Sequence, residues 1–361
     1  MSTRLPDFPW DRLTPYQQQA AKHADGLVDL SIGTPVDPTP EVVRRALCDA
    51  SDSPGYPTVW GTPALRRSII DYLQRRCGSV HLTEDCVLPT VGSKELIASL
   101  PAQLGVRTGE TIVIPEIAYP TYAVGALLAG ATYLASDSTL SVGPRRVPLL
   151  WLNSPANPTG RVLPVDHLRK VVSWARERGV VVASDECYFE CAWDAEPVSV
   201  LDPSVNGGSL DSILAVHSLS KRSNMAGYRA AYLAGDPRLV SELRAVRRHA
   251  GAMVPGPVQA AMRAALDDDG HIEEQRELYL NRRAMLRHAL EGAGFHVDHS
   301  EASLYLWVTR DEPCMQTVRW LAERGILVAP GDFYGAAGSR HVRVALTATD
   351  ERIMSAVSRL D

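Results

Sequence analysis

The chain has 361 residues, which is long for one simple hydrophobic core and suits two subdomains packed together. Apolar residues make up 45% and charged residues 22%, and the net charge of -5 includes no long basic run, which argues against nucleic acid or an anionic membrane as a partner. No stretch approaches the ~20 apolar residues of a membrane span, and residues 1–10 contain no hydrophobic signal core, so we expect a cytoplasmic protein.

The cysteines do not form the pattern of a disulfide scaffold or of a metal site. There are six in the chain, and only Cys187 and Cys191 are close in sequence, without a second pair at metal-site spacing. We therefore expect reduced, structural thiols and no bound metal.

The N-terminal part of the chain is irregular, with one predicted helix at residues 15–23. An extended segment at 28–35 contains Gly33, which allows a close approach of the backbone to another group. Helices are predicted at 39–50 and 62–75, and a rigid Pro-Gly-Tyr-Pro loop lies between them.

From about residue 87 the sequence alternates short apolar runs with helical stretches. The clearest helix spans 165–178, because its apolar residues fall on one face and Gly179 ends it. Strands that alternate with helices and are buried on both faces indicate an α/β fold with a mostly parallel sheet. A ligand is expected at the carboxyl ends of its strands. The predicted strands are 87–88, 111–114, 132–134, 147–152, 180–184, 212–216 and 228–234.

The last third of the chain predicts a long helical region and then a small α+β domain. Residues 237–292 are helical in pattern, with a break near 254–257, and should lead out of the large domain. Strand, helix, strand, strand and helix follow at 303–308, 317–324, 326–328, 341–346 and 350–360. We expect an N-terminal segment (1–35, with Gly26 and Gly33) that packs on the small domain, a large domain (36–255), and an interdomain helix with the small domain (256–361). Residues 202–210 have the composition of a flexible surface loop.

The stretch 215–229 is the first candidate for chemistry. Lys221 falls on a polar turn between two buried strands, where shelter from water can make its amine nucleophilic. Ser218 and Arg229 flank it with a hydroxyl and a permanent positive charge, which suits a phosphate. The alternative is a solvated Lys-Arg turn.

Three further motifs stand at predicted strand ends. Gly92 and Ser93 begin a helix whose backbone N–H groups could hold an anion, although a simple helix cap has the same pattern. Asn157 lies in a proline-rich turn at 153–160. Asp185 ends an apolar strand, either as the cap of the next turn or as a buried carboxylate paired with a cation, and Tyr188 follows it.

Taken in order, these motifs resemble the class I/II aminotransferases. Asn-Pro-x-Gly begins at Asn157, Asp-x-x-Tyr follows 28 residues later, Ser-x-x-Lys places Lys221 36 residues beyond Asp185, and Arg229 lies eight residues further. The resemblance extends from residue 32 to Arg343. It implies pyridoxal-phosphate enzymes of the aspartate aminotransferase fold (fold type I), with a seven-stranded, mostly parallel sheet covered by helices on both faces and a smaller α+β domain.

The resemblance implies a role for each matching residue near the cofactor ring. Lys221 would carry pyridoxal 5'-phosphate as a Schiff base and later move the proton between Cα and the cofactor's C4' carbon. Asp185 would keep the pyridine nitrogen protonated. Tyr188 and Asn157 would hydrogen-bond the phenolic oxygen, and Tyr119 would stack on the ring unless it is only a core aromatic.

The resemblance also implies contacts to the phosphate and to the substrate. Arg343 would clamp the substrate α-carboxylate, and the Gly33 backbone would meet the same group. Tyr56 matches a tyrosine that reaches the phosphate of the neighbouring subunit, which implies a homodimer with two shared sites. The phosphate itself would lie among Gly92, Ser93, Lys94, Ser218 and Arg229.

Within the family, residues 28–38, 328–335 and 341–352 look like the actinobacterial succinyldiaminopimelate aminotransferases. This similarity implies lysine and diaminopimelate biosynthesis, with an amino group passed between glutamate and N-succinyl-2-amino-6-oxopimelate. The loop at 330–335 departs from the family pattern, since Tyr334 takes the usual phenylalanine position. Extra substrate carboxylates would need further cations, for which the candidates are Arg12, Lys22, Arg161 and Arg222.

Several alternatives remain open from the sequence. The amino donor could be alanine, an aromatic amino acid or free diaminopimelate, or the enzyme could be a β-lyase with the same cofactor residues. A catalytically dead ligand-binding relative is the non-enzyme alternative, and the presence of Lys221, Asp185 and Arg229 argues against it.

Overall fold

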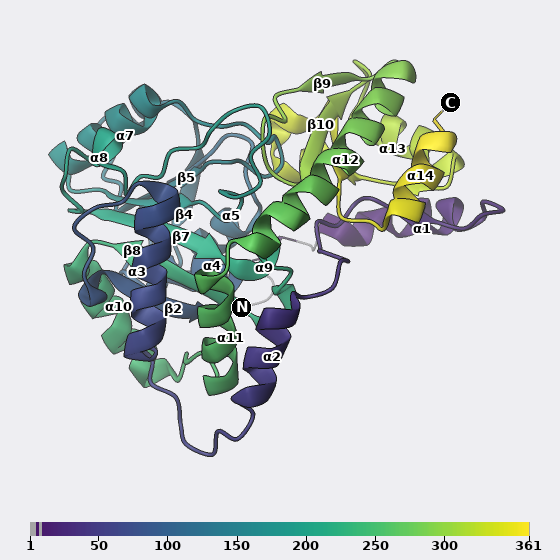
Figure 1. Ribbon diagram of the computed structural model, residues 1–361. Helices are drawn as coiled ribbons and strands as arrows, with labels where there is room; N and C mark the ends of the chain where they lie inside the picture. Colours follow the sequence, from purple (N-terminus) through teal and green to yellow (C-terminus); the bar gives the residue numbers. More distant parts are fainter. Residues whose placement is uncertain (1–4, 7–8, 361) are drawn as a thin grey trace.

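The chain forms two bodies joined by one long helix. The structure is a computed structural model that describes residues 5–6 and 9–360, so residues 1–4 and 7–8 of the predicted N-terminal segment lie outside it. Helix α12 (Gly270–Gly292) runs from the larger body, which contains the main sheet, to the smaller one (Figure 1). The predicted division into 1–35, 36–255 and 256–361 stays a prediction.

The main sheet has seven strands in the order β2-β8-β7-β6-β5-β3-β4. Only β8 is antiparallel to its neighbours, which confirms the mostly parallel sheet. The connection from β7 to β8 explains the reversal, because its eleven residues (219–229) are fewer than the dozen or more that a parallel crossover needs. The strands are β2 (Val87–Val91), β3 (Thr111–Ile114), β4 (Thr132–Ala135), β5 (Leu149–Asn153), β6 (Val181–Asp185), β7 (Ile213–Ser218) and β8 (Ala230–Gly235).

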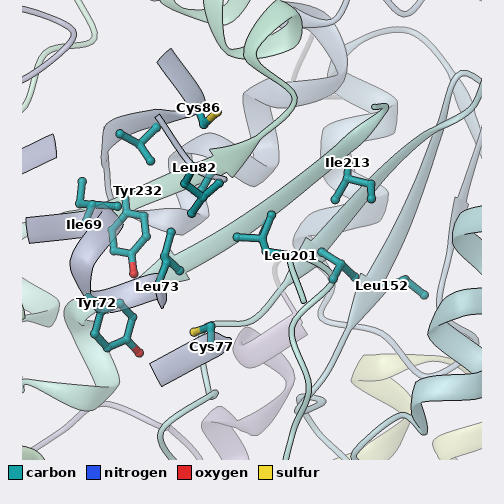
Figure 2. Packing of buried hydrophobic residues seen from close by; sticks show 14 of the residues in the cluster. Ile69, Tyr72, Leu73, Cys77, Leu82, Cys86, Leu152, Leu201, Ile213 and Tyr232 are labelled. Carbon is teal, nitrogen blue, oxygen red and sulfur yellow. The ribbon is translucent and has the colours of Figure 1, made fainter. Parts of the chain in front are cut away.

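Helices cover both faces of this sheet, as the continuous apolar strands predicted. One face packs on α3 (Pro63–Cys77), α7 (Val165–Glu177) and α11 (Gly256–Asp267) in a cluster that includes Ile69, Leu73 and Ile213 (Figure 2). The other packs on α4 (Ser93–Gln103), α5 (Thr121–Leu128) and α10 (Pro237–Ala250). The predicted inner face of α7 is confirmed, since Leu168, Val171, Val172 and Ala175 are buried. Helix α2 (Glu41–Asp49) lies against α11.

The smaller body is built on a four-stranded sheet in the order β12-β13-β10-β9. The N-terminal segment contacts the smaller body through a separate two-stranded sheet, in which β1 (Val28–Asp29) pairs with β11 (Ile326–Leu327), and the Leu30 carbonyl accepts a hydrogen bond from the Ala345 N–H. The remaining elements are α1 (Thr14–Ala20), β9 (His296–Asp298), β10 (Tyr305–Thr309), α13 (Cys314–Glu323), β12 (Ala329–Pro330), β13 (His341–Ala345) and α14 (Asp350–Ser358).

Two predictions about local structure need correction. Residues 202–210 are not simply a flexible loop, because they contain α8 (Pro203–Asn206), in which Asn206 is buried and donates to the Val200 carbonyl. The predicted helical region 237–292 has a second break at 268–269, and β9 was not predicted. Short elements complete the chain: α6 (Thr139–Val142), α9 (Leu219–Arg222), η2 (Pro9–Leu13), η3 (Glu84–Cys86), η4 (Ala226–Tyr228), η5 (Gly331–Tyr334) and η6 (Ala336–Gly338).

All six cysteines are free thiols, as predicted. Within residues 5–6 and 9–360, no helix has both the length and the apolar character that crossing a bilayer requires.

Gly235 at the end of β8 provides a test of the sheet packing. A Cβ there would lie 2.0 Å from the Ile213 carbonyl oxygen of the neighbouring β7, whereas a Cβ at Gly251, also at positive φ, meets nothing within 4 Å. We expect Gly251→Ala to cost ~1 kcal/mol of unfolding free energy and Gly235→Ala to cost ~1–3 kcal/mol more. Urea unfolding measures both, and equal losses would contradict this packing.

Candidate active site

Three neighbouring strands end at residues that the sequence singled out. Strand β5 ends at Asn153, β6 at Asp185 and β7 at Ser218, and Asn153 pairs in register with Asp185. Because these strands are parallel, the loops that follow them emerge at one edge of the sheet. The Asn157 turn, Asp185 and Lys221 are therefore brought to the same side.

Asp185 is a buried carboxylate held by neutral donors. The hydroxyl of Tyr122 donates to it at 2.8 Å and the backbone N–H of Cys187 at 3.1 Å. Burial raises the pKa of Asp185, and these hydrogen bonds offset part of that effect. No described lysine or arginine forms an ion pair with it, so the site suits a cationic N–H that arrives with a ligand.

The thiol of Cys187 lies among three of the predicted residues. Burial raises its pKa well above the usual value, and Asp185 adds to the effect. A hydrogen bond with Ser93 and the positive charge of Lys221 act in the opposite direction. Ser93, Asp185 and Lys221 therefore all lie close enough to this thiol to affect its pKa.

An anion cradle forms where α4 begins. Gly92 is the N-cap residue at φ 80° and has no side chain to cap the helix, so the first turn keeps its N–H groups for a ligand. A Cβ on Gly92 would lie 2.3 Å from the Arg229 guanidinium, which shows how closely that charge covers the turn. Ser218 caps α9 through a bond from the Ser220 N–H and keeps its own proton to donate.

Lys221 lies on α9 and points to the N-terminal segment. Its Nζ donates to the carbonyl of Gly33. Gly33 must be glycine here, since a Cβ would lie 2.0 Å from the Tyr305 hydroxyl. The amine therefore lies where the large body meets the small one.

Arg343 on β13 is buried in the same region. Its Nη1 donates to Asn157 Oδ1 at 2.8 Å and its Nη2 to the Ser31 carbonyl at 2.6 Å. Asn157 is fixed in turn by a bond from its N–H to Asn153 Oδ1. Nε of Arg343 has no hydrogen-bond partner, and no described carboxylate pairs with this guanidinium. A buried, fixed charge of this kind is suited to binding a carboxylate.

Tyrosine rings enclose the Arg343 guanidinium. Its Cζ lies 4.0 Å from the Tyr305 ring centroid and 5.1 Å from that of Tyr334. The hydroxyls of Tyr305 and Tyr188 share a 2.9 Å hydrogen bond. Burial raises the pKa of the half-buried Tyr119 to about 12, so its phenol stays neutral. The walls are aromatic and uncharged around one positive charge.

Comparison with known proteins identifies the group to which this arrangement belongs. The family model "Aminotransferase class I and II" matches residues 25–360. The chain belongs to the class I and II aminotransferases. It is 61% identical over 360 residues to "Probable aminotransferase Rv1178" of Mycobacterium tuberculosis, covering all of this chain and 86% of that one. It is 59% identical to "4-dedimethylamino-4-oxo-anhydrotetracycline transaminase OxyQ" of Streptomyces rimosus, over 99% of both chains.

Solved structures agree with the sequence relatives. An aminotransferase from Neisseria meningitidis superimposes with a TM-score of 0.91 at 30% identity, over all of this chain and 98% of that one. A "probable N-succinyldiaminopimelate aminotransferase" from Thermus thermophilus gives 0.87 at 26% identity, over 98% and 99%. The fold predicted from the sequence is confirmed.

The enzymes of this family use pyridoxal 5'-phosphate, and the residues present fit it. The cradle at Gly92 suits the phosphate, and the buried Asp185 suits a protonated ring nitrogen. Lys221 provides the amine. The chemistry of the donor set thus matches the three polar groups of the cofactor.

Two predicted cofactor contacts remain outside the cluster. Tyr56 is 98% exposed in the α2–α3 connection, which projects from the large body (Figure 1). Lys94 is exposed at the start of α4. Both roles stay predictions, and the position of Tyr56 is compatible with a reach toward another chain.

Sequence reasoning missed four residues that hold the site. Tyr122 bonds Asp185, Asn153 fixes Asn157, Ser31 accepts from Arg343, and Tyr305 bonds Tyr188. The first two belong to motifs noted in the sequence, but nothing local marks Ser31 or Tyr305, because their partners are 312 and 117 positions away.

The raised pKa of Asp185 predicts a pH dependence in cofactor-free protein. A raised folded-state pKa gives a stabilising contribution that is complete below the unfolded value near 3.8 and is lost as pH rises through the folded value. Relative to Asp185→Asn, the parent should therefore lose stability between pH ~4 and neutrality. Urea unfolding across this range measures the difference, and a pH-independent difference would contradict the burial of an uncompensated charge. With pyridoxal phosphate added, the parent should be more stable than Asp185→Asn at neutral pH, because only the Asp185 carboxylate pairs with the ring nitrogen.

Proposed function

We propose that this aminotransferase acts on N-succinyldiaminopimelate with 2-oxoglutarate, as a step of lysine and diaminopimelate biosynthesis in the cytoplasm. The observation that carries the α-amino acid part is Arg343, a buried guanidinium with an open Nε and no carboxylate partner among the described residues. The succinylated substrate is supported by the similarity of residues 28–38, 328–335 and 341–352 to that subfamily and by the name of the Thermus thermophilus structure.

The chain's own residues have separable parts in the proposed reaction. When bound, pyridoxal phosphate supplies an electron sink for the bond that breaks at Cα. Arg343 binds the α-carboxylate, and this orients the Cα–H bond toward Lys221. The Lys221 amine would then take up the Cα proton and deliver it to the cofactor's C4' carbon, and would move it in the opposite direction in the reverse half-reaction. Asn157 and Tyr188 fix the surroundings through Arg343 and Tyr305.

The extra carboxylates of the proposed substrate require another cation. Arg12 is already paired with Asp332 at 2.8 Å, Lys22 is exposed on α1's C-terminal side, and Arg222 is buried behind Lys221. Arg161 is exposed on the Asn157 turn and lines a cavity of ≈ 360 Å³ with His167 and His299. Its guanidinium makes no ion pair with any described residue, so we propose Arg161 for this role.

A second candidate substrate follows from OxyQ, whose name describes transamination of an oxo-anhydrotetracycline. Its identity of 59% over 99% of both chains is much higher than that of the Thermus enzyme. A chain this similar could accept a ring ketone instead of an open-chain 2-oxo acid. The two candidates share the cofactor, Lys221 and Asp185 and differ in what lies beyond Arg343.

A half-reaction distinguishes the substrates. Cofactor-loaded enzyme is mixed separately with N-succinyldiaminopimelate, glutamate, alanine, phenylalanine and free diaminopimelate, and the loss of visible cofactor absorbance is followed. We expect rapid conversion with the succinylated compound and glutamate. Arg161→Met should slow the former ~10-fold or more and leave alanine unchanged.

The other outcomes are equally specific. Conversion by none of these donors, with turnover of the oxo-anhydrotetracycline, would replace the proposal by the second candidate. Release of ammonia and a 2-oxo acid from a donor with a leaving group at Cβ would indicate a β-lyase. Lys221→Ala is the control: it should fold normally, lose the absorbance band of the lysine-bound cofactor and lose all transamination, and turnover near the parent rate would refute the role of Lys221.

We also propose a homodimer in which Tyr56 reaches the phosphate of the neighbouring site. The support is its 98% exposure and the match to the family tyrosine. Tyr56→Phe should weaken cofactor binding ~10-fold, the value of one hydrogen bond to a charged group. Tyr133→Phe, at a tyrosine 46% exposed on β4, is the matched control. Sedimentation should give the mass of two chains; a monomer whose affinity is unaffected by Tyr56→Phe would exclude the shared site.

A further inference from the structure

A cluster of buried polar groups lies behind the catalytic residues. Successive side chains of a strand point to opposite faces, so Glu186 and His217 lie on the other side of the sheet from Asp185 and Ser218. His217 pairs in register with Tyr232 on β8, and their rings stack at 5.3 Å between centroids. Together with Arg222 these side chains line a cavity of ≈ 10 Å³.

Six atoms of this cluster have no hydrogen-bond partner in the described part of the chain. They are all three nitrogens of Arg222, Nε2 of His217, Oε2 of Glu186 and the hydroxyl of Tyr232. Each residue is at least 94% buried. Nε2 and Oε2 lie 3.2 Å apart, a charge pair when the imidazole is protonated, yet neither completes a hydrogen bond. A buried guanidinium left in this way is costly unless something else bonds it.

The groups around the cavity are engaged elsewhere. The hydroxyl of Tyr72 donates to Glu190 at 2.8 Å, and Arg76 pairs with Glu190 at 2.7 Å. The Arg222 guanidinium lies 4.5 Å from the Tyr72 ring centroid. Figure 2 shows Tyr72 and Tyr232 at one end of the same buried cluster, near Cys77, on the α3 side of the sheet. The remaining acceptors and donors therefore face the cavity without a protein group between them.

The volume and the lining of the cavity point to one occupant. About 10–15 Å³ is the smallest space of this kind that holds a water molecule, and a buried water needs two to four polar partners. Arg222, Glu186, His217 and Tyr232 supply donors and acceptors in that number. An apolar occupant would leave all of them unsatisfied.

Three members of the cluster, all but Tyr232, are also chain neighbours of residues at the candidate site. Arg222 follows Lys221, Glu186 follows Asp185, and His217 precedes Ser218. Fixing the three rear side chains consequently fixes the backbone that carries the amine, the ring carboxylate and a phosphate ligand.

We propose that this cavity is an internal water site, and that Arg222, bound to that water, is a positioning residue for Lys221. The inference rests on the roles proposed for Lys221 and Asp185. Arg222 is also the residue next to Lys221 in the chain and carries a buried positive charge at the cavity that Glu186 and Glu190 line.

The experiment compares three variants of the cofactor-loaded protein. Arg222→Met removes the charge at similar volume, Arg222→Lys keeps it, and Arg66→Met removes another buried arginine, paired with Glu84 in the same body but away from the catalytic residues. The readout is the pH midpoint at which the visible absorbance of the Lys221-bound cofactor changes. A crystal structure of the parent locates the water.

Loss of the positive charge leaves the nearby Glu186 and Glu190 carboxylates, so protonation of the lysine-bound cofactor becomes easier. Arg222→Met should raise the midpoint by roughly half a pH unit or more, Arg222→Lys should restore most of the parent value, and Arg66→Met should leave it unchanged. An unchanged midpoint in Arg222→Met, or a parent cavity without water density, would overturn the proposal.

Two further results keep this test separate from the proposed function. If Arg222→Met does not fold, Arg222→Lys and the parent structure still test the proposal. A pH midpoint in Arg222→Lys that is raised by roughly the half unit expected for loss of the charge would contradict the role of Arg222. A parent protein with no visible cofactor absorbance would instead refute the assignment of Lys221.

Discussion

The buried guanidinium of Arg343 is the constraint on which the site depends. A charge in this position is tolerated only with bonded partners, and its two partners come from parts of the chain far from strand β13: the Asn157 turn of the large body and Ser31 of the N-terminal segment. Neither body can build the carboxylate site alone. The N-terminal segment, paired with β11 of the smaller body through β1, is therefore as much a part of the site as the strand ends of the large sheet.

Asp185 is a buried acidic group at the same site, whereas Arg343 is a buried positive charge. Its carboxylate is bonded only by Tyr122 and the Cys187 N–H, both neutral, and its pKa is raised by burial. Asp185 and Arg343 are thus a buried acid and a buried base that do not neutralise each other. Each keeps its unbalanced charge for an outside group, which trades stability of the unliganded chain for affinity. The site is arranged for a ligand with a cationic ring nitrogen and an anionic carboxylate.

The sequence predicted the secondary-structure elements and the order of the motifs along the chain. It predicted few of the hydrogen bonds between residues that are far apart in sequence. Strand and helix positions, the parallel core and the cluster of Asn157, Asp185 and Lys221 follow from apolar runs and strand-end motifs. The loop prediction for 202–210 was wrong because Asn206 folds its amide inward to the carbonyl of Val200, six positions earlier, a local bond that the glycine-rich composition does not reveal. Tyr305 was missed for a different reason, since its role exists only once β10 approaches Tyr188.

Different residues of the site bind the cofactor and select the substrate, which explains why close relatives can be named for different reactions. The groups for the cofactor and for an α-carboxylate come from buried positions tied into both bodies, so substitution there disturbs the whole constellation. The Tyr305 and Tyr334 rings enclose Arg343, whereas Arg161, which we propose for the extra substrate carboxylates, is exposed and makes no ion pair with any described residue. Substrate choice can therefore change at the rim while the chemistry of Lys221 stays fixed, and identities of 59–61% to Rv1178 and OxyQ fix the reaction class more firmly than the substrate.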